Sequence, residues 1–173
     1  MFKELNTLKL FLEDPTKKFS VREVARLLKI SPATASKKLK YFNKQGLLKY
    51  KQELNHDLYK ANIENHKFRD LKVYYSITKI KNSNLIQELN KFYVKPTIIL
   101  FGSTATGYDT KNSDIDLVII TEKKQDFPKL NEFQKIFKKQ LQLFVLKDLK
   151  DLKNSHLINN VLSGIVLQGE INF

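Results

Sequence analysis

The chain has 173 residues, of which 42% are hydrophobic and 11% aromatic, so its composition excludes a disordered protein and suits one domain or two small ones. It has no cysteine, which excludes disulfides and cysteine-bound zinc, and no apolar run approaches the roughly 20 residues of a membrane-spanning helix. The net charge is +13, and residues 1–62 hold 14 basic against 6 acidic residues. This excess favours a polyanionic partner such as nucleic acid, although a generally Lys-rich surface would give the same count.

Three helices are predicted in the first third of the chain. Residues 3–13 have apolar residues at helical spacing. The second helix starts at Ser20, which forms a capping-box pattern with Glu23. The third starts at Ser31, with proline at its first position, and ends at Gly46. Two strands with a turn near residues 55–57 follow, and they predict a β-hairpin wing.

The third helix is basic on the face opposite its apolar residues, and a tight turn joins it to the second, as in a helix-turn-helix. Over residues 1–62 the pattern "SVREVARLLKISPATASKKLKYFNKQGLL" resembles the winged helix-turn-helix domains of prokaryotic transcription regulators. The resemblance implies that double-stranded DNA is a partner and that residues 32–45 enter its major groove. It assigns phosphate contacts to Lys37, Lys38, Lys40 and Lys44, and base or sugar contacts to Thr34, Ser36 and Tyr41. A homodimer is expected, since such regulators bind paired half-sites; a dimerisation or protein-docking role remains the alternative.

A linker helix is expected over residues 63–82, with Phe68, Leu71, Tyr74 and Tyr75 on its apolar stripe. Residues 83–173 then predict strands at 96–101, 115–120 and 141–146, a helix at 128–138, and a further helical segment before a short last strand. The loop between the first two strands is rich in turn-forming residues. The fold class is therefore α+β, with a small mixed sheet in the second domain.

Two acids mark the start of the strand at 115–120. Because strand side chains alternate, Asp114 and Asp116 share one face. Two like charges this close raise a pKa or recruit a cation, and Mg²⁺ takes carboxylates together with substrate phosphates. Gly102 and Ser103 precede them in a turn whose backbone suits a phosphate. The sequence therefore predicts a single site for metal and triphosphate.

The stretch "FGSTATGYDTKNSDIDLV" resembles the signature of the DNA polymerase beta-like nucleotidyltransferases, most of all the minimal prokaryotic members, which include antitoxins that transfer AMP to a partner toxin. The resemblance implies a nucleoside triphosphate substrate, two Mg²⁺ ions on the catalytic Asp114 and Asp116, and nucleotide contacts from Gly102, Ser103 and Ser113. The acceptor would be a hydroxyl of a protein or nucleic acid. A toxin-like protein is a further candidate partner.

Two positions depart from this family's pattern. The third carboxylate of the family aligns with Gln142, which is neither a base nor an anionic ligand, and a common basic position is occupied by Thr106. Two functions therefore stay open: a nucleotidyltransferase joined to a DNA-binding domain, or a regulator whose degenerate domain senses a nucleotide or docks a partner. The N-terminus lacks the features of a signal peptide, so a cytoplasmic protein without membrane contact is expected.

Overall fold

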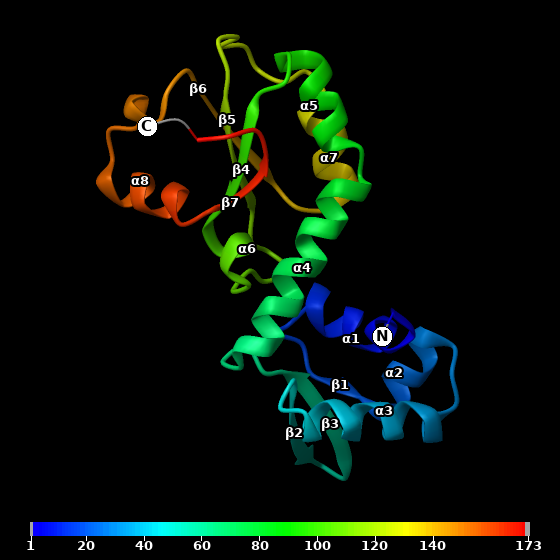
Figure 1. The fold of residues 1–173 in the computed structure, drawn as a ribbon. Helices are drawn as coiled ribbons and strands as arrows, with labels where there is room; N and C mark the ends of the chain where they lie inside the picture. The colour runs from blue at the N-terminus through cyan, green and yellow to red at the C-terminus, as the bar shows by residue number, and fades with distance from the viewer. Residues whose placement is uncertain (1, 172–173) are drawn as a thin grey trace. The chain divides into compact units, whose positions relative to one another are not determined.

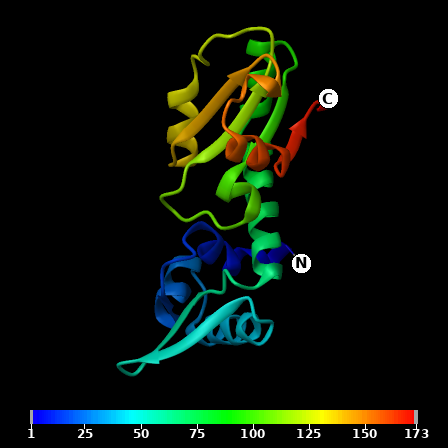
Figure 2. The same ribbon diagram turned by 90° about the vertical axis from the view of Figure 1, so that its left-hand side faces the viewer.

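A computed structural model describes the backbone of residues 2–171 and the side chains of residues 6–171. The chain forms two compact units, residues 1–72 and 73–173 (Figures 1 and 2). The domain boundaries expected from the sequence, after residues 62 and 82, stay predictions. None of the helices within residues 2–171 combines the length and apolar character that crossing a membrane would require.

The N-terminal unit combines three helices with a small antiparallel sheet. The helices are α1 (Phe2–Glu13), α2 (Val21–Leu28) and α3 (Pro32–Lys44), and the strands are β1 (Phe19–Ser20), β2 (Leu48–Glu53) and β3 (His56–Ala61), in sheet order β1-β3-β2. The Ser20 hydroxyl accepts a hydrogen bond from the Glu23 amide at 3.2 Å, and Ser31 accepts one from the Thr34 amide at 3.1 Å. The predicted helix starts are thus confirmed, whereas β1 was not predicted, since two residues carry no periodic signal.

The core of this unit draws side chains from all three helices and from the sheet. Phe11 packs edge-on against Phe19, with 5.0 Å between ring centroids, and Leu39 of α3 is fully buried. Helix α4 (His66–Asn82) starts in this unit and buries Phe68 and Lys72. The Lys72 ammonium donates to the Leu12 carbonyl at 2.6 Å, at the C-terminal end of α1, where a positive charge is favoured. Burial of this lysine was not foreseen.

The C-terminal unit is a four-stranded mixed sheet with helices on both faces (Figure 1). Its strands are β4 (Thr97–Phe101), β5 (Ile115–Ile120), β6 (Leu141–Leu146) and β7 (Ile165–Gln168), in order β6-β5-β4-β7. Strand β4 is antiparallel to β5 and β7, whereas β5 and β6 are parallel. The remaining elements are α5 (Leu85–Tyr93), α6 (Gly102–Thr106), α7 (Leu130–Phe137), a 3₁₀ turn (Leu149–Asp151) and α8 (Ser155–Leu162).

Alternation along the strands divides the core into two layers. Leu117 and its neighbours on one face pack with α5 and α7, and Val118 and its neighbours on the other face pack with α8. The α+β class and the mixed sheet are as predicted.

Two local predictions were wrong. Residues 102–106, expected as part of a loop, form the short helix α6, which is bounded by two glycines in left-handed conformation, Gly102 at φ 70° and Gly107 at φ 76°. Tyr74, expected on the apolar stripe of α4, is 52% exposed. Phe68 of the same predicted stripe is buried, and Leu71 and Tyr75 are half-buried, so the error is limited to Tyr74.

Candidate functional site

The turn after β4 brings glycine and aspartate into contact. Phe101 pairs with Asp116 across the antiparallel ladder, so Gly102, the next residue, lies beside that carboxylate. A Cβ placed on Gly102 would meet Asp116 Oδ2 at 2.6 Å. Only glycine allows this approach at a positive φ, and the structure therefore explains why a glycine stands at the end of the strand.

Asp114 and Asp116 flank the first residue of β5 and are both half-buried. Burial raises the pKa of the Asp116 carboxyl above its ordinary value, and the nearby charge of Asp114 raises it further. The site thus holds two like charges in partly desolvated positions, an arrangement that a divalent cation relieves.

Gln142 lies on the neighbouring strand at the level of these acids. It pairs with Asp116 in the parallel register of β5 and β6, and its side-chain amide donates to Asp114 Oδ2 at 2.5 Å. A neutral amide therefore stands where the family resemblance calls for a third carboxylate. Within the described residues, no three His, Asp or Glu side chains gather to hold a metal.

These residues fit one Mg²⁺ that arrives with its nucleotide. Two carboxylates, with phosphate oxygens and water completing the shell, are the ligand set that Mg²⁺ accepts. The two expected ions would have to share Asp114 and Asp116, because Gln142 adds no negative charge.

The loop between α6 and β5 is held by buried polar contacts that sequence reasoning missed. Asp109, 3% exposed, pairs with Lys139 at 2.7 Å, and the same ammonium donates to the Thr110 carbonyl at 2.8 Å. The buried Thr104 hydroxyl donates to the Asp114 carbonyl at 3.2 Å. These bonds fix the path of the chain into β5 and so position Asp114 and Asp116.

The predicted nucleotide contacts have different surroundings. The Ser103 carbonyl accepts from the amides of Tyr108 and Asp109, which closes the turn after α6. The Ser113 hydroxyl accepts from the Thr110 amide at 2.9 Å and so closes the following turn. Thr106, in place of a basic residue, bonds to carbonyls of its own helix. Gly102 lies beside Asp116, and Ser103 follows it as the second residue of α6, whereas the Ser113 side chain bonds within the loop.

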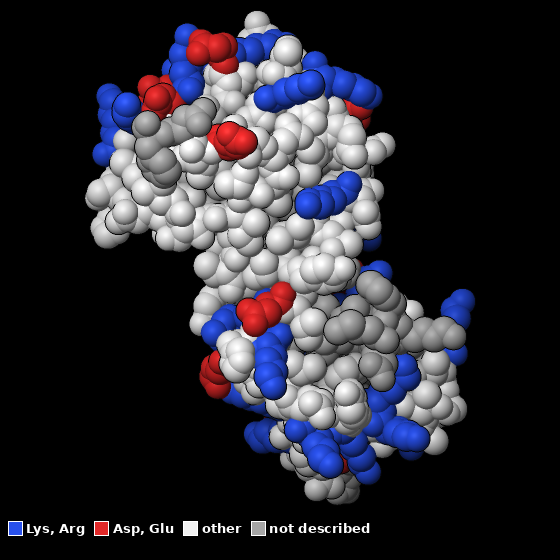
Figure 3. Space-filling view, in the orientation of Figure 1, with Lys and Arg blue, Asp and Glu red and all other residues white. Residues whose placement is uncertain are grey.

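The second candidate site is α3, in the basic N-terminal unit (Figure 3). Its predicted contacts differ in exposure: Thr34, Lys37, Lys40, Tyr41 and Lys44 are exposed, and Ser36 and Lys38 are half-buried. The Thr34 hydroxyl also lies 2.8 Å from that of Ser31, so it takes part in the helix cap. Most of the side chains predicted to contact DNA are therefore exposed on one side of α3.

Two family models match the chain, each over one segment. The family described as "Nucleotidyltransferase domain" matches residues 82–158, and "Iron dependent repressor, N-terminal DNA binding domain" matches residues 10–55. No curated protein is similar enough to match. A solved structure described as a possible transcriptional regulator from Methanosarcina mazei Go1 is 23% identical, with a TM-score of 0.37, and the likeness covers 53% of this chain and 78% of that one.

A structural likeness at that level carries no argument, so the assignment rests on the two family models and the geometry above. Each model falls on the unit in which the sequence predicted its fold, and both resemblances are confirmed at this level. The chain therefore carries an N-terminal DNA-binding domain of the repressor winged-helix type and a C-terminal nucleotidyltransferase domain.

Proposed function

We propose that the protein binds double-stranded DNA through α3 and transfers a nucleoside monophosphate from a nucleoside triphosphate to an acceptor hydroxyl. The observation that carries the proposal is the contact between Gly102 and the Asp116 carboxylate, with Asp114 on the same face. At this point the phosphates of a nucleotide could approach the backbone of Gly102 and the carboxylates of Asp114 and Asp116. The two adjacent charges oppose each other, and a bound cation would offset that cost.

The roles of the residues follow from their places. Gly102 and Ser103 would hold the β and γ phosphates, and Asp114 and Asp116 would hold Mg²⁺, which supplies positive charge to the phosphates when bound. The acceptor oxygen forms a bond to the α-phosphorus, the bond from that phosphorus to the bridging oxygen breaks, and pyrophosphate leaves. The hydroxyl proton goes to solvent, because Gln142 cannot take it.

The test is incubation with each α-³²P-labelled triphosphate and Mg²⁺, with a cell lysate as the source of acceptors. Label should move to an acceptor with the wild type and not with Asp114→Ala. The Asp126→Ala variant, which removes an exposed acid outside the site, should behave as the wild type does. Absence of transfer by the wild type under all four triphosphates would contradict the proposal.

A second function is favoured by one observation, the hydrogen bond from Gln142 to Asp114. General-base help is worth about 10²- to 10⁴-fold, and a site without it binds a nucleotide more readily than it reacts. The domain would then sense a nucleotide and change the affinity of α3 for DNA. Here the wild type transfers no label, binds triphosphate with Mg²⁺ in calorimetry, and shows a nucleotide effect on DNA binding that Asp114→Ala removes.

Several further assignments follow the same proposal. A cytoplasmic location and a homodimer suit a DNA-binding regulator with paired half-sites. A toxin-like protein partner, as in the antitoxins that the sequence resembles, would appear as a tight heteromer on purification from its own cells.

A further inference from the structure

Strand β6 lies at one edge of the C-terminal sheet, and half of its backbone groups point away from that sheet. The Ile115 amide donates to the Gln140 carbonyl at 2.9 Å, and the Thr121 amide donates to the Leu146 carbonyl at 2.8 Å. In a parallel pair alternate residues bond to the neighbouring strand, so the even-numbered residues of β6 face β5. The N–H and C=O groups that point outward along the free edge are those of Leu141, Leu143 and Val145.

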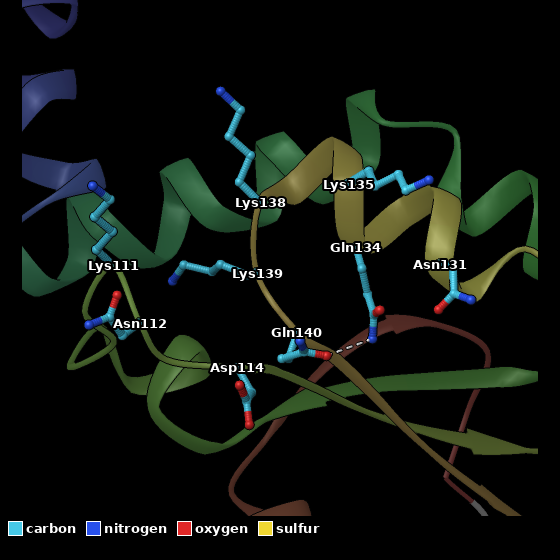
Figure 4. A pocket seen from close by; sticks show the side chains of 9 residues that line it. All are labelled: Lys111, Asn112, Asp114, Asn131, Gln134, Lys135, Lys138, Lys139 and Gln140. Carbon is cyan, nitrogen blue, oxygen red and sulfur yellow. Dashed lines mark hydrogen bonds between the residues drawn. The ribbon is translucent and has the colours of Figure 1, made fainter.

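These outward groups have few partners. Within the described residues, only the Gln134 side chain of α7 reaches them, at 3.5 Å from the Leu141 carbonyl oxygen, which is the far limit of a hydrogen bond. Figure 4 shows this end of β6, where Gln134 also donates to Gln140 at 3.0 Å and both line a pocket of about 550 Å³. Further along, Leu143 is half-buried, whereas Leu117, its partner on the same face of the sheet, is fully buried. The exposure therefore comes from the edge position.

Free strand edges are usually protected from pairing with other strands by charge, proline, a bulge or short length. Strand β7, at the other edge, has such protection: it is four residues long, its pairing with β4 shifts register, and Gly169 follows it at φ 79°. Strand β6 has six residues, LQLFVL, without charge or proline, and keeps one register with β5 throughout. Such an edge is a template for a further strand.

The charges at the two ends of β6 match a second copy of the same strand. Lys138 and Asp148 are exposed, have no ion pair within the described part of the chain, and lie equally far from Leu143 on either side. An antiparallel pair centred on Leu143 brings Lys138 of each copy toward Asp148 of the other. Lys139 and Lys147 also come opposite each other in this register, but each already has an ion pair within its own copy.

We propose that two copies of the chain pair through their β6 strands, antiparallel and centred on Leu143, so that their two sheets become one. Leu143 then exchanges both backbone hydrogen bonds with its counterpart, and Leu141 does so with Val145 of the second copy. The outward groups of the edge thereby gain the partners that they lack in one copy.

The pairing also reaches the candidate site. In this register Gln142 lies opposite Phe144 of the second copy, in a pair of the kind whose side chains approach most closely. Gln142 is exposed and donates to Asp114. The second copy therefore places an aromatic ring beside the amide that holds one acid of the site. The interface does not rest on the transfer function and is equally expected if the domain only binds a nucleotide.

The first experiment introduces cysteines, because the chain has none. The Cα atoms of such a pair are about 4.5 Å apart, which a disulfide can bridge. An equimolar mixture of full-length Gln142→Cys and Phe144→Cys should form a linked dimer under mild oxidation, and either protein alone should not. Val166→Cys, at an exposed position on β7, should link with neither. No link in the mixture, or an equal link within one protein alone, would overturn the proposed pairing.

The second experiment measures the dissociation constant of the dimer by sedimentation, without DNA or nucleotide. Asp148→Lys should raise it by about tenfold, because like charges then meet at both ends, and adding Lys138→Asp should restore it. Val145→Pro removes an outward N–H, leaves the bonds to β5 intact, and should abolish the dimer. Melting temperatures show whether each variant is folded, and the charge-reversal pair decides if Val145→Pro is not. A wild type that stays monomeric at about 100 μM, or a dimer that charge reversal leaves unchanged, would overturn the proposal.

Discussion

The two candidate sites differ in how their charged side chains are exposed and in what those side chains contact. On α3, Lys37, Lys40 and Lys44 are exposed. In the nucleotidyltransferase domain, Asp114 and Asp116 are half-buried, and each touches a defined neighbour: Gln142 for the first and Gly102 for the second. The charges of α3 would therefore act on DNA separately, whereas the two aspartates depend on each other and on the backbone around them.

This difference predicts how each site responds to mutation. Exposed charges that hold phosphates contribute similar and nearly additive amounts to binding. Charges that share one partly desolvated site are coupled, so that removing any member removes most of the function.

Asp116→Asn should have the largest effect. The change keeps the size of the side chain but removes the charge that would hold Mg²⁺ beside Gly102. Charge stabilisation by a bound metal is worth several kcal/mol, so label transfer should fall by about 10³-fold. The measurement is the initial rate of transfer with saturating triphosphate. A rate within tenfold of the wild type would show that Asp116 is not a ligand in the reacting complex.

Gln142→Glu should act in the opposite direction. The new carboxylate would stand next to Asp116 in the parallel register and could take the proton of the acceptor. Transfer should rise by about 10²-fold, the lower end of general-base catalysis. Gln125→Glu, at an exposed position outside the site, serves as the control. An unchanged rate with Gln142→Glu would mean that proton removal does not limit the reaction.

Two glycines allow a matched comparison between the domains. Gly102 and Gly46 have nearly the same positive φ, 70° and 73°, and a Cβ on Gly46 would meet the Asn65 amide nitrogen at 2.9 Å. Alanine at either position should cost about 1–2 kcal/mol in free energy of unfolding. Only Gly102→Ala should also abolish Mg²⁺-dependent nucleotide binding in calorimetry. Loss of nucleotide binding in both variants would point to general unfolding instead.

A single Lys37→Ala substitution should weaken binding of duplex DNA only several-fold. Its salt slope should fall by about 0.9, the contribution of one phosphate on a duplex. Lys37→Ala combined with Lys44→Ala should lower the slope by about twice as much, measured by anisotropy at several salt concentrations. A loss from the pair that greatly exceeds the sum would contradict the independence of these charges.

The smallest expected effect is on how the stability of the protein, without divalent cations, depends on pH. Burial raises the pKa of Asp116, with a further contribution from Asp114, so the native state holds this proton more tightly than the unfolded chain does. The stability that results is fully present below the unfolded pKa and is lost as pH rises through the raised native pKa. Without divalent cations, Asp116→Asn should therefore be the more stable protein at neutral pH. Melting temperatures of the two proteins across pH should converge on the acid side, and parallel curves would contradict this account.

Local signals made the winged-helix unit and the acidic strand predictable. A serine cap followed by proline fixed the start of α3, and alternation predicted that Asp114 and Asp116 lie on one side of the chain, where Gln142 pairs with one and bonds the other. These signals work because capping and strand alternation involve residues only two to four positions apart. For the same reason the glycine-bounded loop could be located, although its short helix α6 was missed.

Contacts between residues far apart in the chain arise from packing and could not be predicted from local patterns. Lys72 is buried because the end of α1 accepts its ammonium, and Lys139 is held because Asp109 lies opposite it. The amide of Gln142 reaches Asp114 only through the parallel pairing of β5 with β6. Residue types at neighbouring positions were enough to locate most of the turns, helices and strands. Which distant side chains meet, and hence the hydrogen bond on Asp114, depended on packing that no local pattern records.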